Sequence, residues 1–151
     1  NWDPKRWSAD NFAVLGDRLA RNLGMGIVIT GAGRDMILGD TIAMKMQARP
    51  LVLCGRTTLK QLGAIFEKAK LVVANDSGPM HIAVALKANT IALFGPTSPD
   101  ITGPIGSGRH IVMKKEIDCQ IPCYDMSCGY NRCMDLITVD EVMEKAKEML
   151  S

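Results

Sequence analysis

Most residues suited to chemistry lie in one short stretch of the 151-residue sequence, which reads NDSGPMH from position 75 to 81. Asp76 and Ser77 can bond sugar hydroxyls or backbone donors, and His81 can reach back to an anion from one turn into a helix. Gly78 can adopt backbone angles that are closed to other residues. The stretch predicts a tight polar turn followed by a helix end, where unpaired N–H groups and a positive partial charge favour a phosphate.

A buried strand and a helix are expected on either side of this turn. Residues 71–75 begin with four apolar residues, β-branched at Val72 and Val73, and end at polar Asn75, which is typical of a short buried strand. Pro79 has the fixed φ that suits the first position of a helix, and the small side chains that follow let this helix lie close to a sheet. Because Asp or Ser at such a turn is commonly just a helix cap, capping alone is the alternative interpretation.

Strands and helices alternate along the whole chain. Short apolar runs predict strands, and apolar residues at helical spacing behind capping residues predict helices. Strands are expected at 27–29, 50–53, 71–75, 90–94 and 111–113; helices are expected from Ser8 to Gly24, across 36–47, after Thr57 or Thr58, from Pro79 to Leu86, and from a capping box at 138–141 to Leu150. The alternation predicts an α/β protein, a three-layer α/β/α fold with a parallel sheet.

Polar loops follow four of the expected strands, at 30–35, 54–58, 75–78 and 94–99. In parallel α/β sheets, ligands bind beyond the carboxyl ends of the strands. We therefore expect these loops to line one edge of the sheet. The last loop, FGPTSP, has two prolines, and it either forms a wall of a ligand site or simply turns the chain.

Composition and charge exclude several classes of protein. The chain is 47% apolar and 23% charged, as expected for one soluble globular domain. Its net charge of +2 is too small to indicate a nucleic-acid partner. No apolar run approaches the roughly 20 residues of a membrane span. The polar start of the sequence does not resemble a signal peptide, so a cytoplasmic location is expected.

Two further charged residues are candidates for ligand contacts. Asp35 follows the Gly-Ala-Gly loop at 31–33, and it can accept hydrogen bonds from ribose hydroxyls or act only as a negative charge at a helix N-terminus. The glycines of that loop match a dinucleotide-binding fingerprint incompletely. Lys5, in the sequence KRW, can contact a diphosphate or be an ordinary solvated charge.

Four of the five cysteines, Cys119, Cys123, Cys128 and Cys133, fall in one short segment. Their spacing lacks the pairs two residues apart that are usual at zinc sites. Without a secretory signal, reduced thiols that pack in the protein are the first interpretation. A structural metal bound by these cysteines, or two disulfides, are the alternatives.

The wording of these motifs resembles glycosyltransferase family 9, the ADP-heptose:lipopolysaccharide heptosyltransferases. The segments that carry the resemblance are NDSGPMHIA at 75–83, FGPTSP at 94–99, TGP at 102–104, KRW at 5–7, TGAG at 30–33, TTL at 57–59 and the four-cysteine segment. The resemblance covers essentially the whole chain, and the first of these segments is the most specific.

The resemblance implies a GT-B fold, in which two Rossmann-like halves face each other across a cleft. Residues 1–151 would form the C-terminal, nucleotide-sugar-binding half, with the N-terminal acceptor half and the first strand outside this sequence. The implied reaction is inverting transfer of heptose from ADP-heptose to the lipopolysaccharide inner core, without a cofactor or metal. The general base would lie in the other half, so this chain would carry no catalytic residue and be inactive alone. Peripheral association with the cytoplasmic face of the inner membrane is also expected.

By the same resemblance, seven residues would bind the donor. Lys5 would contact the diphosphate, Asp76, Ser77 and Gly78 would hold the diphosphate and sugar with His81 nearby, Thr57 would lie against adenine, and Asp35 would bind the ribose.

Two other functions stay open. One is another GT-B enzyme, such as a sugar-nucleotide epimerase, although the Asp-Ser-Gly-Gly sequence and paired glutamates typical of those enzymes are absent from this turn. The other is a cysteine-rich interaction module without catalysis, in which the turn at 76–81 only caps a helix.

Overall fold

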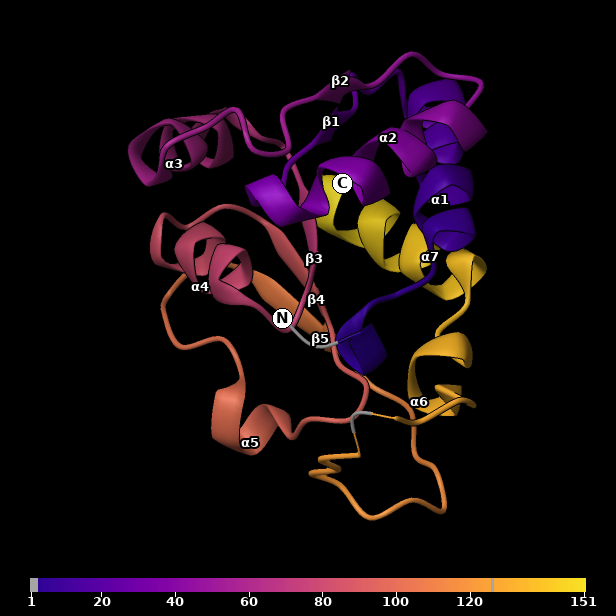
Figure 1. Ribbon diagram of the computed structural model, residues 1–151. Coiled ribbons are helices and arrows are strands. Elements are labelled where there is room, and N and C mark those ends of the chain that lie inside the picture. Colours follow the sequence, from indigo (N-terminus) through magenta and orange to yellow (C-terminus); the bar gives the residue numbers. More distant parts are fainter. Residues whose placement is uncertain (1–2, 126) are drawn as a thin grey trace. The chain divides into compact units, whose positions relative to one another are not determined.

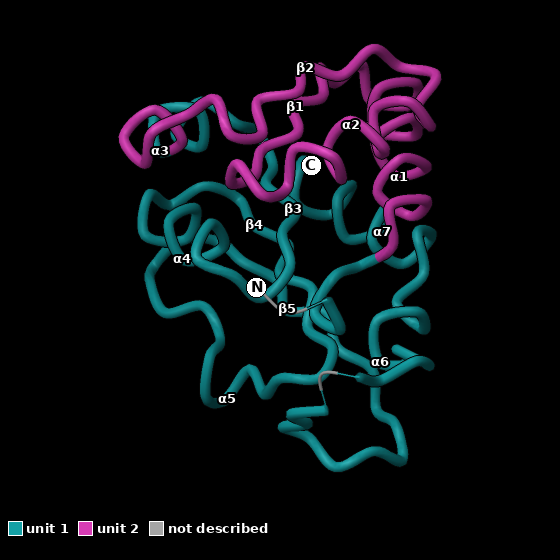
Figure 2. The backbone as a smooth tube through the Cα atoms, in the orientation of Figure 1, with its two compact units in different colours: residues 1–7, 63–151 teal, residues 8–62 magenta. Residues whose placement is uncertain are grey.

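The computed structural model describes residues 3–125 and 127–151, and the chain forms two compact units (Figures 1 and 2). Unit 1 contains Asn1–Trp7 and Gly63–Ser151, and unit 2 contains Ser8–Leu62. Helix α3 (Leu59–Lys68) begins in unit 2 and ends in unit 1.

Unit 2 contains two helices and a parallel pair of short strands. Its elements are α1 (Ala9–Leu23), β1 (Val28–Ile29), the 3-10 turn η2 (Gly33–Asp35), α2 (Met36–Lys45) and β2 (Leu51–Val52). Strand β1 pairs with β2 in parallel, with Val28 opposite Leu51. Ala13 on α1 packs with Ile42 and Met46 to form the core between the two helices.

The predicted ends of the first helix are confirmed. Ser8 is the N-cap of α1, and its hydroxyl accepts a hydrogen bond from the backbone N–H of Asn11 at 3.1 Å. Gly24 ends the helix in the left-handed conformation, with φ of 63°, which glycine adopts without steric cost.

Unit 1 contains a three-stranded parallel sheet. Its elements are η1 (Asp3–Lys5), β3 (Val72–Asn75), α4 (Gly78–Ala85), β4 (Thr90–Leu93), α5 (Pro99–Thr102), β5 (His110–Met113), α6 (Arg132–Asp135) and α7 (Val139–Leu150). The strand order is β3-β4-β5, and Val72 lies opposite Thr90 and Thr90 opposite His110.

Strand β4 is the centre of this unit, and all four of its residues are buried. Ala92, with Phe94 just beyond the strand, packs on Met80 and Val84 of α4. Helix α7 contacts the same strand, and Figure 1 shows α4 and α7 on opposite sides of the sheet. The expected parallel pairing with helices on both faces is therefore confirmed in this unit.

The last helix begins as its sequence predicts. The Thr138 hydroxyl accepts a hydrogen bond from the N–H of Glu141, and the Glu141 carboxylate accepts one from the N–H of Thr138, so the capping box is formed. Lys115 also forms an ion pair with Glu141.

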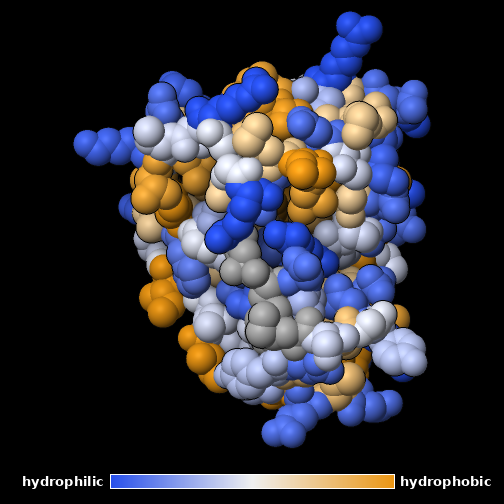
Figure 3. Space-filling view, in the orientation of Figure 1, coloured by the Kyte–Doolittle hydropathy of each residue, from blue (hydrophilic) through white to orange (hydrophobic). Residues whose placement is uncertain are grey.

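The sequence patterns missed four short elements of the described residues, namely η1, η2, α5 and α6. Pro4 is buried within η1, and α5 lies in the segment after β4, for which no helix is predicted. Hydrophobic residues occur in separate groups among hydrophilic ones on the face shown in Figure 3. Within the described residues, no helix is long and apolar enough to cross a membrane.

Candidate functional site

Asp76, in the turn between β3 and α4, is one of the few buried polar residues of unit 1, with 6% of its surface exposed. Its Oδ2 atom accepts hydrogen bonds from Lys5 Nζ at 2.7 Å, Thr97 Oγ1 at 2.7 Å and Thr102 Oγ1 at 3.1 Å. We call these four residues the Asp76 cluster. A buried carboxylate is costly without partners, and these donors, one of them a cation, offset that cost.

Trp7 holds the segment that carries Lys5. Its indole is buried and donates a hydrogen bond from Nε1 to the carbonyl of Ile137 at 2.8 Å. Its backbone N–H donates to Oδ1 of Asn75, the last residue of β3, at 3.1 Å. The aromatic residue of the KRW motif is thus an anchor, and it places Lys5 beside the turn that follows β3.

The loop after β4 brings both threonines to Asp76. The backbone N–H of Asp76 donates to the carbonyl of Leu93 at 3.0 Å, so the loop begins next to the turn. The N–H of Cys123 donates to the carbonyl of Pro96 at 2.7 Å. Gly103 follows α5, and a Cβ there would lie 2.1 Å from the carbonyl oxygen of Pro99, so only glycine fits.

Helix α4 begins without a side-chain cap in the part of the chain that the structure describes. Ser77 is the N-cap residue, but its hydroxyl donates instead to the carbonyl of Asn75 at 3.0 Å. The interpretation of Asp76 and Ser77 as simple helix caps is therefore wrong, because Asp76 accepts from the cluster and Ser77 bonds backwards. Pro79 has no N–H, and the N–H of Met80 donates to the carbonyl of Ser77 at 3.1 Å, so among the described residues the N–H of Gly78 is the first-turn donor left for solvent or a ligand.

The prediction that Gly78 is needed for backbone angles closed to other residues is also wrong. In the described residues, glycines with positive φ occur at 24, 55 and 106, and Gly78 is not among them. A Cβ on Gly78 would meet nothing within 4 Å, so the space above the first turn of α4 is open. His81, one turn further along, is exposed. The helix end is accessible, whereas the Asp76 carboxylate beneath it is enclosed by protein.

The turn between β1 and α2 is built differently. Oδ2 of Asp35 accepts a hydrogen bond from the N–H of Ala32 at 3.0 Å, so this carboxylate closes its own loop. A Cβ on Gly31 would lie 2.9 Å from Asp35 Cβ and 3.1 Å from Cys54 Sγ, which explains a small residue there. Burial raises the pKa of the Cys54 thiol, and the nearby carboxylates of Asp35 and Asp40 raise it further.

Thr58, and not Thr57, caps α3. The N–H of Thr58 donates to the side chain of Gln61 at 2.9 Å, and the Thr58 hydroxyl accepts from the N–H of Gln61 at 3.3 Å.

The predicted ligand residues fall into two groups. Lys5, Asp76, Ser77, Gly78 and His81 lie together in unit 1, and Asp35 and Thr57 belong to unit 2.

The polar loops meet in pairs. In unit 2 the N–H of Gly55 donates to the carbonyl of Gly31 at 2.9 Å, which joins the loops at 30–35 and 54–58. In unit 1 the loops at 75–78 and 94–99 meet at Asp76 and Thr97. That all four loops line one edge stays a prediction.

The cysteine segment supports the loop after β4. All five cysteines are free thiols, and Cys133 is buried, with its Sγ 3.2 Å from where a Cβ on Gly95 would lie. Burial raises the pKa of Cys133, and the neighbouring thiols of Cys128 and Cys119 raise it further. Among residues 3–125 and 127–151, no group of three or more His, Cys, Asp or Glu side chains is placed to hold a metal ion.

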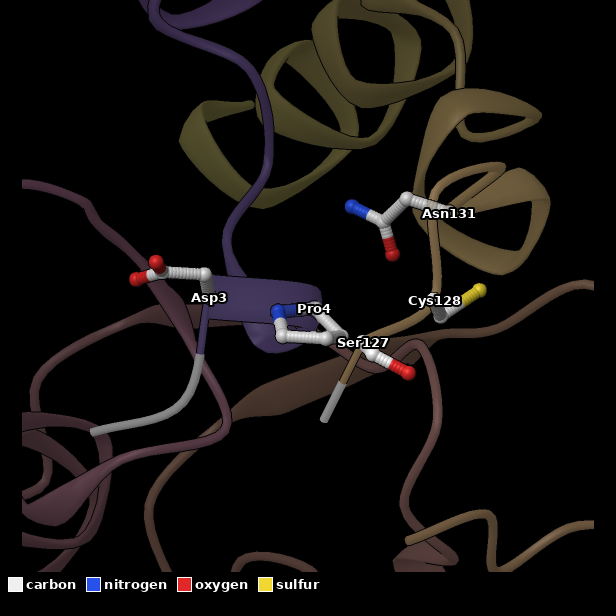
Figure 4. Close-up of a pocket in the computed structure, with 5 residues that line it drawn as sticks. All are labelled: Asp3, Pro4, Ser127, Cys128 and Asn131. Carbon is white, nitrogen blue, oxygen red and sulfur yellow. The ribbon is translucent and has the colours of Figure 1, made fainter. Parts of the chain in front are cut away.

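A cavity of about 250 Å³ lies elsewhere in unit 1 (Figure 4). It is lined by Asp3 and Pro4 of η1 and by Ser127, Cys128 and Asn131 of the cysteine segment. None of these residues is a predicted ligand contact, and the cavity is smaller than most small-molecule sites. The open end of α4 remains the better candidate.

Sequence reasoning missed the threonines of the Asp76 cluster. Thr97 and Thr102 follow Asp76 by 21 and 26 residues, in a loop that was predicted only to form a wall or a turn. No periodicity marks them. Their one sequence signal is that they belong to the short motifs FGPTSP and TGP, in which a proline lies within two residues of each threonine and stiffens the backbone.

Comparisons with solved structures place the fold in a class of sugar-transferring enzymes. The structure of the Escherichia coli ADP-heptose lps heptosyltransferase II matches with a TM-score of 0.84 and 32% identity, over 97% of this chain and 42% of that one. The glycosyl transferase family 9 structure from Veillonella parvula matches with a TM-score of 0.80 and 28% identity over the same 97% of this chain. The α/β class with a GT-B likeness is therefore confirmed.

The sequence comparisons define the family. The model for glycosyltransferase family 9 (heptosyltransferase) matches residues 1–133, and the chain belongs to this family. It is 31% identical to lipopolysaccharide heptosyltransferase 2 of Salmonella typhimurium, over 97% of this chain and 43% of the relative. It is 32% identical to lipooligosaccharide heptosyltransferase 2 of Campylobacter jejuni, over 97% of this chain and 47% of the relative. The chain thus spans less than half the length of these relatives.

Proposed function

We propose that this chain is the donor-binding part of an inverting heptosyltransferase and that it binds ADP-heptose through the N-terminus of α4. The observation that carries the proposal is the open, uncapped start of this helix at Gly78, with the Lys5 ammonium held beside it by Asp76. A helix N-terminus and a cation together suit a diphosphate. Family membership and the name of the matched E. coli structure support ADP-heptose as the donor.

The chemistry follows from where charge develops. Transfer breaks the bond between the anomeric carbon of the sugar and the diphosphate, so negative charge grows on the leaving phosphate. The N–H of Gly78 at the start of α4, the Lys5 ammonium and the exposed His81 side chain would stabilise that charge. Ser77 and Gly78 would contact the diphosphate, since Gly78 is exposed and a Cβ there would meet nothing within 4 Å. This electrostatic role does not require a bound metal.

The acceptor side of the reaction lies outside this chain in our proposal. In our proposal His81 serves the leaving diphosphate and the Asp76 carboxylate is taken up by its three donors, so the acceptor hydroxyl would be activated by another part of the natural protein. In-line attack from that side would invert the anomeric centre. The proposed acceptor is the lipopolysaccharide inner core, at the cytoplasmic face of the inner membrane, and membrane fractionation would test that location. The contacts of Asp35 and Thr57 with the nucleoside stay predictions.

Two alternatives are less well supported. A module in which the 76–81 turn only caps a helix disagrees with the backward bond of Ser77 and the enclosed carboxylate of Asp76. A sugar-nucleotide epimerase would need its own carboxylates near the ribose, and the sequence of this turn lacks the paired glutamates typical of those enzymes.

Calorimetric titration of ADP into the full-length natural protein tests the proposal. Lys5→Met should weaken ADP binding by about tenfold or more, since one charge-assisted hydrogen bond is worth at least 1.4 kcal/mol. Lys115→Met is the matched control. Lys115 also forms an ion pair with a carboxylate of unit 1, that of Glu141 on α7, but it is not part of the turn before α4. It should leave the affinity for ADP unchanged. Absence of ADP binding by the unmodified protein, or equal losses in both variants, would contradict the proposed function.

A further inference from the structure

In the Asp76 cluster, one cation and two hydroxyls contact the same carboxylate oxygen, Oδ2 of Asp76. The Lys5 side chain is 24% exposed, whereas that of Asp76 is 4% exposed. Thr97 is buried, and its hydroxyl is 2.7 Å from Asp76 Oδ2. Lys5 is therefore the member of the cluster that can turn toward a ligand, and the carboxylate and Thr97 are fixed inside the protein.

A conflict follows if Lys5 is to hold a diphosphate. Moving the ammonium toward a ligand takes a cation away from a carboxylate that stays buried, which is strongly unfavourable unless other donors remain. Thr97 supplies one such donor at 2.7 Å. Thr102 supplies a weaker second one at 3.1 Å, because its single O–H is shared with the carbonyl of Ser98 at 3.3 Å.

We propose that Thr97 and Thr102 are positioning residues of the donor site, whose hydroxyls keep Asp76 in place and satisfied while Lys5 is shared with the diphosphate. The inference rests on the proposed function, since it assumes that Lys5 binds a diphosphate. In this role the FGPTSP and TGP motifs provide hydroxyl groups that keep Asp76 hydrogen-bonded. A loop that only walls a site or turns the chain would not need them. The two threonines set how easily Lys5 leaves Asp76.

The rest of the loop is built to keep these hydroxyls in place. The Cys123 N–H holds the carbonyl of Pro96, one residue before Thr97. Gly103 lets the chain close against Pro99, so that Thr102 faces Asp76 from the last position of α5. The cysteine segment thereby supports the donor site through a backbone hydrogen bond.

Paired titrations with ADP and with adenosine test this inference in the full-length natural protein. Thr97→Val removes one donor and makes Asp76 depend more on Lys5, so the affinity for ADP should fall by about tenfold. The affinity for adenosine, which has no phosphate for Lys5 to contact, should stay the same. Thr97→Ser restores the hydroxyl and should restore ADP binding. Thr102→Val, at the longer 3.1 Å contact, should show the same selectivity with a smaller loss of about threefold.

Thr90→Val is the matched control, because Thr90 is a buried threonine of the same unit whose hydroxyl donates to the carbonyl of Ala88 at 2.8 Å. It should lower the melting temperature without changing the ratio of ADP to adenosine affinity. Equal ratios in the Thr97 and Thr90 variants, while the unmodified protein binds ADP, would overturn the inference and leave the proposed function standing. No ADP binding by the unmodified protein would overturn the proposed function itself.

Discussion

Two turns of this chain look alike in sequence and are built on different principles. Each follows a parallel strand, precedes a helix and contains an aspartate. In the β1–α2 turn, Asp35 bonds the N–H of Ala32, three residues earlier. In the β3–α4 turn, Asp76 bonds residues that are 71, 21 and 26 positions away along the chain.

The difference separates a local cap from an assembled site. The Asp35 carboxylate bonds within its own loop, and that loop is joined to its neighbour by the backbone bond from Gly55 to Gly31. The Asp76 turn needs η1, the end of β3 and the loop around α5 to be in place together, so it forms only when unit 1 is folded. It also leaves the helix after it uncapped, as a site for an anion requires and a purely structural turn does not.

The largest expected effect is at the assembled turn. Asp76→Ala leaves the Lys5 ammonium and two hydroxyls without their shared acceptor, and it should lower the free energy of unfolding by about 3 kcal/mol. Urea denaturation at neutral pH measures this loss. Asp100→Ala is a suitable control, since Asp100 is an exposed aspartate of α5 whose carboxylate accepts a hydrogen bond from the nearby Ser98 hydroxyl at 3.3 Å. A loss below about 1 kcal/mol at Asp76 would show that the cluster is not a cooperative unit.

The contrast also explains what could be predicted from the sequence. Local sequence signals were sufficient to predict several helix ends. Ser8 and Gly24 cap the two ends of α1, and Thr138 with Glu141 forms the capping box at the start of α7. Alternation of apolar runs gave the parallel pairing of the strands, although β1 and β2 are shorter than expected. These features depend on neighbours within a few residues, which a pattern can register.

The inside of the site could not be derived in the same way. The polar residues of the turn at 75–81 were identified, but the enclosure of Asp76 depends on Thr97 and Thr102, whose positions are set by tertiary packing. Gly78 was predicted for its backbone freedom, and it serves instead by leaving space above the helix. Such roles depend on what lies opposite a residue, and spacing along the chain does not carry that information.

The ion pair of Lys115 with Glu141 can be compared with that of Lys5 with Asp76, and its contribution to folding stability is expected to be smaller. Hydrogen bonds from Lys115, and from the N–H and hydroxyl of Thr138, hold the pKa of Glu141 at about 2, below its ordinary value of 4.5. This pair is partly exposed, with 39% of the Glu141 side chain accessible, so screening by solvent limits its contribution to about 1 kcal/mol.

The sign of the pH effect follows from the lowered pKa. Glu141 stabilises the folded state fully above pH 4.5, and that stabilisation is lost as the pH falls toward 2. Glu141→Gln should therefore remove part of the loss of stability between pH 4.5 and 2, as measured by thermal unfolding across that range. ADP affinity at pH 7 should not change. An unchanged acid profile in the variant would mean that Glu141 is not the group that titrates there.

The smallest expected effect is at the local turn, and it tests the predicted ribose contact directly. Asp35→Ala removes one cap-like hydrogen bond and should cost about 0.5–1 kcal/mol of unfolding free energy. Asp35→Asn keeps an oxygen that can accept from Ala32 and should recover most of that stability. If Asp35 only closes its loop, both variants bind ADP as the unmodified protein does. If the Asp35 carboxylate also binds a ribose, Asp35→Ala should weaken ADP and adenosine binding equally, because both ligands carry the sugar. Asp35→Asn, which recovers most of the folding stability, should then show whether the loss of affinity comes from the ribose contact or from the weakened loop.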